Sequence, residues 1–191
     1  MMRTTLLIGA VLSLVAGGAP GAEPSSKDAK ASSVERGRYI VQTTGCHDCH
    51  TPWIDGPAGP EPDMTRALIG HPESDGVPEP ASLSGPWIAA VSPTNTAWSG
   101  PWGISFTANL TPDAETGLGQ WTERMFRDAI RNGRHKGRGR PILPPMPVMV
   151  YKNFTDDDLA AIFAYLQSLP PVRNQVPEPV APPERVADST P

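Results

Sequence analysis

This chain contains the stretch Gly45-Cys46-His47-Asp48-Cys49-His50, on which the interpretation of its structure depends. Cys46 and Cys49 are the only two cysteines among the 191 residues, and His50 directly follows the second of them. Cysteines with this spacing are found in redox pairs, in metal sites and where a cofactor is covalently attached. Because the chain has no second pair, it does not supply the four thiolates of an all-cysteine tetrahedral zinc site.

The residues around the cysteines distinguish between these possibilities. A thioredoxin-like redox pair needs a strand before its first cysteine, whereas residues 32–44 have a helical pattern. A zinc site would have to recruit histidines, and those of this chain lack the usual paired spacing: His47, His50, His71 and His135. The pattern C-x-x-C-H is typical of covalent haem attachment and uses every residue. It predicts one haem c, bound through Cys46 and Cys49, with His50 as the proximal ligand of the iron.

The start of the chain has the pattern of an export signal. Arg3 precedes an apolar run from Leu6 to Ala16, which is long enough for a signal peptide and too short for an ordinary transmembrane helix. We predict that residues 1–22 are a cleaved signal peptide; a retained anchor is the alternative. No later stretch is apolar enough to span a membrane, so we expect a soluble, exported, periplasmic protein.

Composition limits the regular structure that the mature chain can form. After signal removal roughly 170 residues remain, which is the length of one domain. The 24 prolines and 18 glycines exclude helix and strand from long stretches. We therefore expect an all-α fold in which three main helices surround one covalently bound haem, with a long, irregular, Pro- and Gly-rich insertion.

Capping residues and apolar spacing locate the three helices. The first is predicted to begin at Ser32, with Glu35 completing a capping box, and to end at Gly45. The second is predicted over Thr122–Asn132, and the third from Thr155 to Leu169. The three carboxylates of the third helix's first turn stabilise a helix start and are not interpreted as a catalytic cluster: Asp156, Asp157 and Asp158.

The remaining segments are predicted to be irregular. Residues 23–32 are expected to form a flexible N-terminal segment, and residues 171–191 a Pro-rich, disordered tail. The insertion at residues 51–120 contains four tryptophans, which argue against disorder: Trp53, Trp87, Trp98 and Trp102. We expect it either to wrap the haem edge or to form a surface loop whose tryptophans pack on the helices. Within it, a short helix is plausible over residues 63–69.

The ligand on the distal face of the iron decides between carrying electrons and binding a substrate. Met146 lies in Pro144-Pro145-Met146-Pro147, where three prolines stiffen the chain and present the thioether at little entropic cost. Met146 is therefore the predicted distal ligand, and Met149 is the runner-up. The other candidates are Met64, Met125, His71 and His135.

Several stretches together resemble class I c-type cytochromes. They are Arg36-Gly37-Arg38-Tyr39, the C-x-x-C-H motif, Pro145-Met146-Pro147 and the stretch from Thr155 to Leu166. The stretch from Ala108 to Trp121 is similar to the cytochrome subunit domains of bacterial alcohol and aldehyde dehydrogenases. Those subunits commonly hold several haem motifs, whereas this chain has a single one.

The resemblance implies a class I cytochrome c fold over residues 33–170. It implies that Met146 is the distal ligand. It also implies that Gly37 lets the first helix cross closely over the last one, near Phe163 or Tyr165. The function implied is single-electron transfer between redox partners, without catalysis by this chain. The alternatives are a haem enzyme or gas sensor with an open distal site, and a fixed haem subunit of a dehydrogenase complex.

A basic cluster provides a candidate surface for docking of redox partners. It extends from the second helix to the stretch at residues 144–147, here called the methionine loop, and consists of Arg124, Arg127, Arg131, Arg134, Lys136, Arg138 and Arg140. An acidic partner protein could be steered to it; the alternative is a solvated helix face. The formal net charge of −4 disfavours nucleic acid as a partner.

Overall fold

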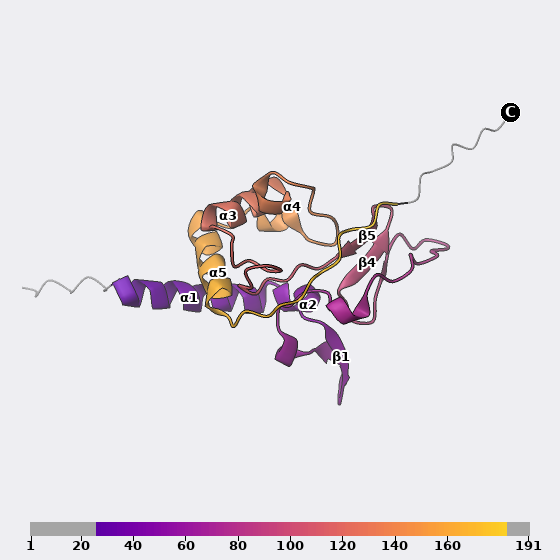
Figure 1. Cartoon of the computed structure of the whole chain (residues 1–191), viewed down its shortest axis with the longest axis horizontal. Coiled ribbons are helices and arrows are strands. Elements are labelled where there is room, and N and C mark those ends of the chain that lie inside the picture. The colour runs from indigo at the N-terminus through magenta and orange to yellow at the C-terminus, as the bar shows by residue number, and fades with distance from the viewer. Residues whose placement is uncertain (1–25, 183–191) are drawn as a thin grey trace, which may run out of the picture.

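The structure, a computed structural model, describes residues 26–182 (Figure 1). The predicted signal peptide and residues 183–191 of the predicted tail lie outside these described residues. The helices are α1 (Ser26–Thr43), α2 (Cys46–His50), α3 (Glu123–Asn132), α4 (Val148–Tyr151) and α5 (Asp156–Ser168). In Figure 1, α5 crosses α1, and α3 and α4 lie on the opposite side of the molecule from α1.

The bounds predicted for the second and third helices are confirmed to within one residue. The hydroxyl oxygen of Thr122 accepts a hydrogen bond from the backbone N–H of Met125, so Thr122 is the N-cap of α3. Gly133, at φ 62°, ends α3 in the left-handed conformation that glycine adopts without strain. Thr155 caps α5 in the same way by accepting from the N–H of Asp158. Local hydrogen bonds thus set these helix boundaries.

The first helix begins earlier than predicted. It starts at Ser26, so Ser32 lies inside α1 and is not its N-cap. Residues 26–32 are therefore helical, and the prediction of a flexible segment is wrong for them. The strong helix formers Lys27, Ala29, Lys30 and Ala31 explain why the helix extends past the capping pattern.

α1 and α5 cross closely at Gly37. A Cβ atom built on Gly37 would lie 1.9 Å from the carbonyl oxygen of Ala161 and 2.8 Å from Cβ of Tyr165. Any side chain at Gly37 would therefore force the helices apart. This geometry confirms the expected close crossing and places it beside Tyr165.

The expectation of an all-α fold is wrong, because the insertion contains two small antiparallel sheets. β1 (Trp53–Gly56) pairs with β2 (Gly59–Pro62). In the second sheet β4 (Ala97–Gly100) lies between β3 (Ala90–Val91) and β5 (Gly103–Phe106). These strands have at most four residues and are interrupted by Gly and Pro, so they are too short to produce a recognisable alternating pattern.

Three single-turn 3₁₀ helices complete the regular structure of the described residues: η1 (Met64–Arg66), η2 (Glu73–Asp75) and η3 (His135–Gly137). The helix considered plausible over residues 63–69 is present only as η1. Its N-cap is Asp63, whose carboxylate accepts a hydrogen bond from the N–H of Thr65.

The segment after α5 is held on the surface of the domain. Asn174, 6% exposed, donates hydrogen bonds from Nδ2 to the carbonyl oxygens of Ile69 and His71. Val180 pairs with Ile104 of β5 as an isolated bridge. The yellow chain in Figure 1 accordingly runs from α5 to β5. The prediction of disorder is therefore wrong for residues 171–182; the proline content that excluded helix also suits extended chain.

The core joins the helices to one part of the insertion. Its buried side chains come from α1, α3, α5 and residues 68–118: Ile40, Val41, Leu68, Leu118, Phe126, Ile130, Leu159, Ile162 and Leu166. Cys46 and Met146 are both partly buried and both pack against this cluster. The core therefore brings the motif and the methionine loop, far apart in sequence, to one hydrophobic centre.

Candidate functional site

The C-x-x-C-H motif forms the short helix α2, directly after α1. Gly45 separates the two helices and has a left-handed backbone with φ 79°, which permits the sharp turn. Cys46 and Cys49 are both free thiols, so they form no disulfide. Burial raises the pKa of both thiols. The redox-disulfide interpretation is thus not supported by the arrangement of the pair.

His50 is oriented by a residue far away in the sequence. Its Nδ1 lies 2.8 Å from the backbone carbonyl oxygen of Ala108. A carbonyl oxygen only accepts hydrogen bonds, so Nδ1 carries the proton and donates, and Nε2 keeps a free lone pair. Burial is the main cause that lowers the pKa of His50, which favours the neutral ring. This is the form in which histidine binds a metal.

The carbonyl of Ala108 is itself held in place by the next residues. The side-chain oxygen of Asn109 accepts hydrogen bonds from the N–H and hydroxyl of Thr111, and its Nδ2 donates to the carbonyl of Val172. The stretch that begins at Ala108 is therefore tied to the segment after α5. Sequence reasoning did not find Ala108, because a backbone carbonyl leaves no signal in the side chains.

The methionine loop is anchored on two sides. The hydroxyl of Ser105, in β5, donates to the carbonyl oxygen of Pro144. The hydroxyl of Tyr151, in α4, donates to the carbonyl oxygen of Thr44, next to the turn before the motif. Met146 lies between these anchors, against the core. The loop is thereby attached both to the insertion and to the start of the haem motif.

The other residues considered as distal ligands of the iron differ from Met146 in their burial and in their contacts. Met149 is 71% exposed and Met64 is 58% exposed, whereas Met146 packs on the core. His71 is buried, with Nδ1 hydrogen-bonded to the hydroxyl of Thr96 and Nε2 to the carbonyl of Gly76, so both of its ring nitrogens are occupied. His135 is exposed and stands edge-on to a tryptophan ring. Met125 lines a separate cavity beside α3.

The groups gathered here fit a covalently bound haem. They comprise two free thiols, an imidazole with a fixed tautomer and a thioether on the same core. Among residues 26–182, two buried polar atoms of the insertion lack a hydrogen-bond partner, Trp98 Nε1 and Thr107 Oγ1. Trp98 lies directly opposite Ser105 in the β4–β5 ladder, so its side chain faces the side of the methionine loop. Unpaired buried donors of this kind suit a cofactor that carries polar groups.

The seven residues of the basic cluster divide into two groups. Four have acidic partners: Arg124 with Asp128, Arg127 with Glu123, Arg131 with Asp156, and Arg140 with Glu178. Within residues 26–182, the other three form no ion pair: Arg134, Lys136 and Arg138. The cluster predicted as one patch is thus partly neutralised by the protein itself.

Comparison with known proteins agrees with this site. A family model described as cytochrome c matches residues 34–170. The chain belongs to the cytochrome c family. Haem c bound covalently is the cofactor of this family, and its proteins transfer electrons. The C-x-x-C-H motif places the family histidine at His50, immediately after Cys49.

Curated relatives of this cytochrome are parts of bacterial dehydrogenases. The chain is 30% identical over 159 residues to one of the subunits of nicotinate dehydrogenase from Pseudomonas putida, covering 83% of this chain and 10% of that protein. It is 28% identical over 156 residues to the cytochrome c subunit of the quinone alcohol dehydrogenase of Gluconobacter oxydans, covering 80% and 25%. It is 26% identical over 163 residues to the fructose dehydrogenase cytochrome subunit of Gluconobacter japonicus, covering 82% and 26%. The chain therefore spans about a quarter or less of the length of these relatives.

The described part of the chain offers no further metal site and no membrane span. Among residues 26–182 no group of three or more His, Cys, Asp or Glu side chains is arranged to hold a metal ion. Over the same residues, no helix combines the length and the apolar character that crossing a bilayer requires.

Proposed function

We propose that this cytochrome is an exported, soluble carrier of single electrons, with one haem c held by Cys46 and Cys49 and ligated by His50 and Met146. The observation that carries the proposal is the hydrogen bond from His50 Nδ1 to the carbonyl of Ala108, 2.8 Å long. It leaves Nε2 as the free base and holds the ring in one orientation, as the ligand of an iron requires.

The contacts that hold the methionine loop support ligation of the iron by the Met146 thioether. Haem c supplies an iron that cycles between the ferric and ferrous states, and thioether ligation raises its potential. Ser105 and Tyr151 hold the backbone on either side of Met146. A thioether that is fixed before and after electron transfer keeps the distal position closed to small ligands. This favours a carrier over a haem enzyme or gas sensor, for which the only good distal acid or base candidates were His71 and His135.

The partner proposed as electron donor is a dehydrogenase. The relatives named above are cytochrome subunits of alcohol and fructose dehydrogenases and a subunit of nicotinate dehydrogenase. By this proposal, the present chain accepts electrons from such an enzyme and has no substrate of its own. The proposal of export rests on residues 1–22, which have the pattern of a signal peptide.

Mass spectrometry and optical spectroscopy of the protein purified from a periplasmic extract test the proposal. The mass should equal a chain that begins near residue 23 plus one haem. The ferric protein should show the weak near-infrared band of sulfur ligation. This band should vanish in Met146→Ala and persist in the control Met149→Ala, because Met149 is 71% exposed.

Each part of the proposal can fail separately. An apoprotein mass would remove the haem and the carrier role with it. A five-coordinate, high-spin spectrum of the unaltered protein would favour an open distal site and a haem enzyme. Recovery of the whole chain, including residues 1–22, from the membrane fraction would contradict cleavage and export as a soluble protein.

A further inference from the structure

A short loop between α3 and the methionine loop presents cations that the protein does not neutralise. The loop comprises residues 134–140 and contains η3. Lys136 and Arg138 are exposed, and neither forms an ion pair within residues 26–182. Arg140, in contrast, is held by Glu178 at 2.9 Å. The unpaired charge of the basic cluster is thus concentrated in this loop.

The loop is rigid because its own polar groups hold it. The side-chain amide of Asn132 donates to the carbonyl of Gly137, and the guanidinium of Arg134 donates to the carbonyl of Gly139. The backbone N–H of His135 donates to the carbonyl of Arg140. These bonds fix the backbone without using the side chains of Lys136 and Arg138. Little backbone entropy is therefore lost when the loop meets a partner.

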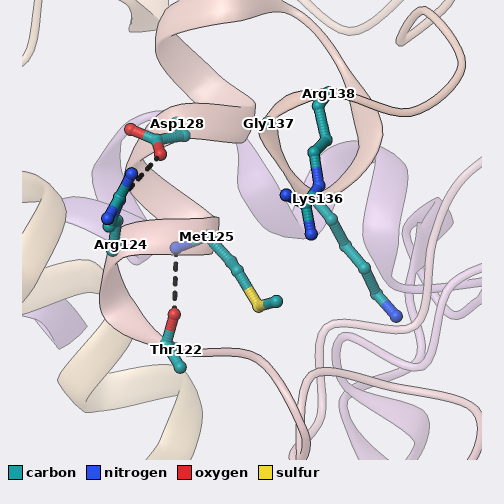
Figure 2. Close-up of a pocket in the computed structure, with 7 residues that line it drawn as sticks. All are labelled: Thr122, Arg124, Met125, Asp128, Lys136, Gly137 and Arg138. Carbon is teal, nitrogen blue, oxygen red and sulfur yellow. Dashed lines mark hydrogen bonds and ion pairs between the residues drawn. The ribbon is translucent and has the colours of Figure 1, made fainter.

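A cavity beside the loop can receive side chains from a partner. It has a volume of about 350 Å³ and lies between α3 and the loop, as Figure 2 shows. Lys136 and Arg138 line it from the loop, and Met125 points into it from α3. Asp128 also lines the cavity, but its carboxylate is engaged by Arg124 at 3.5 Å. An incoming carboxylate would meet unpaired cations and an apolar thioether.

An exposed apolar surface adjoins the cationic loop. Met149 and Val150 of α4 are 71% and 64% exposed. α4 packs beside the end of α3, since a Cβ on Gly133 would lie 3.2 Å from Val148, and Arg131 donates to the carbonyl of Lys152. Apolar residues next to a charged rim are the usual composition of a protein interface, in which Met and Arg are enriched. α4 begins two residues after Met146, so the surface lies close to the proposed distal ligand.

The charge of the chain is distributed unevenly in a way that favours one kind of partner. Residues 122–140 contain seven of the 16 cationic residues and only two of the 20 acidic ones. The rest of the chain contains nine cationic and 18 acidic residues, so an acidic partner is favoured most strongly at residues 122–140. Burial first, and then Arg140 and Lys136, lower the pKa of His135, as expected for a locally positive surface.

We infer that the loop at residues 134–140 and the exposed face of α4 form the docking surface for a redox partner protein with an acidic surface. This inference rests on the proposed carrier function. Lys136 and Arg138 steer and hold the carboxylates of the partner, and Met149 and Val150 supply the apolar contact. Four of the seven cations of the basic cluster are neutralised within the molecule and contribute little.

Electron exchange with small redox probes tests the loop. Reduced holoprotein is oxidised in a stopped-flow instrument by hexacyanoferrate(III), which takes one electron and becomes hexacyanoferrate(II). In Lys136→Glu/Arg138→Glu the rate constant at low ionic strength should fall about tenfold, and the salt dependence should weaken. Oxidation by the cationic tris(phenanthroline)cobalt(III) should not slow.

A matched control separates the place of the charge from its amount. Lys27→Glu/Lys30→Glu changes the net charge equally, but at the exposed start of α1, away from α3 and α4 in Figure 1. Its rate constant with hexacyanoferrate(III) should stay within about twofold of the unaltered protein, because the substituted charges lie at the start of α1 and not at the proposed docking surface (Figure 1). An equal fall in both variants would overturn the inference, since net charge alone would then explain it.

Competition identifies the class of partner. Poly-L-glutamate at low salt should slow the oxidation of the unaltered protein by hexacyanoferrate(III) and leave the loop variant unaffected. Competition by phosphatidylglycerol vesicles but not by poly-L-glutamate would assign the surface to a membrane and overturn the inference. If the unaltered protein carries haem and exchanges electrons while the loop variant behaves identically, docking fails and the carrier function stands. If the unaltered protein exchanges no electrons, the proposed function itself fails.

Discussion

The substitution Gly37→Ala sets two physical effects of opposite sign against each other. Gly37 lies inside α1, where alanine is favoured over glycine by about 1 kcal/mol of helix propensity. The added Cβ, however, would lie 1.9 Å from the carbonyl oxygen of Ala161, whereas ordinary contacts begin at 3.4 Å. The two helices must therefore separate by roughly 1.5 Å. The sign of the measured change in the free energy of unfolding shows which effect is larger.

The size of the steric effect follows from what the crossing buries. Five core side chains of α1 and α5 depend on it: Ile40, Val41, Leu159, Ile162 and Leu166. Their burial is worth about 10 kcal/mol in total. Even a gap of about 0.5–1 Å, smaller than this separation, forfeits roughly a quarter to a half of the dispersion attraction. After the gain in propensity, the net loss is about 2–4 kcal/mol. This is a large part of the stability of a small domain.

Guanidinium unfolding of the holoprotein, followed by far-ultraviolet circular dichroism, measures this loss. With a slope of about 4 kcal/mol/M, the midpoint should fall by about 0.5–1 M. The matched control is Ala31→Gly, at an exposed position of α1, which should cost only the propensity of about 1 kcal/mol. A Gly37→Ala protein as stable as the unaltered one would refute the close crossing.

Three further substitutions test other parts of the fold. Burial raises the pKa of Tyr151 to about 12, so the contribution of the neutral phenol to stability is complete below the unfolded pKa of about 10 and is lost as the pH rises from there toward 12. Tyr151→Phe should cost about 1 kcal/mol at pH 7 and should reduce this alkaline loss of stability in urea unfolding. An unchanged alkaline slope would contradict this assignment. Ser32→Ala should be neutral or slightly stabilising in thermal unfolding, because Ser32 is inside α1, whereas a loss of about 1 kcal/mol would restore it as an N-cap. Asn174→Ala removes two donors to buried carbonyls and the acceptor for the N–H of Glu73. The substitution should therefore lower the free energy of unfolding by about 2–4 kcal/mol and make the chain cleavable by trypsin at Arg173. Unchanged protease resistance would show that other contacts hold residues 171–182.

Features that depend on interactions between neighbouring residues could be predicted from the sequence alone. The motif at Cys46, Cys49 and His50 is defined by spacing alone, because all three groups must reach the same cofactor from one turn of helix. The starts of α3 and α5 were predictable to within one residue because Thr122 and Thr155 accept hydrogen bonds from backbone N–H groups three residues further on. Such signals do not need knowledge of the rest of the fold.

The predictions that failed concern segments whose structure depends on distant partners. The short strands of the insertion exist because each finds a neighbouring strand, and residues 171–182 are held because Asn174 meets the carbonyls of Ile69 and His71. Composition showed only that these segments contain much Pro and Gly, which is common to disorder and to irregular but fixed chain.

The orientation of the site depends on contacts that form only in the folded chain, and so does the set of unpaired charges. The partner of His50 is the backbone oxygen of Ala108, 58 residues away, and a backbone atom carries no mark in the sequence. The basic cluster is a run of similar residues in the sequence, yet Arg131 is paired with Asp156 of α5 while Lys136 and Arg138 have no acidic partner within residues 26–182. Hydrogen bonds and ion pairs act over a few ångströms, so they are settled by the packing of the folded chain and not by the order of its residues.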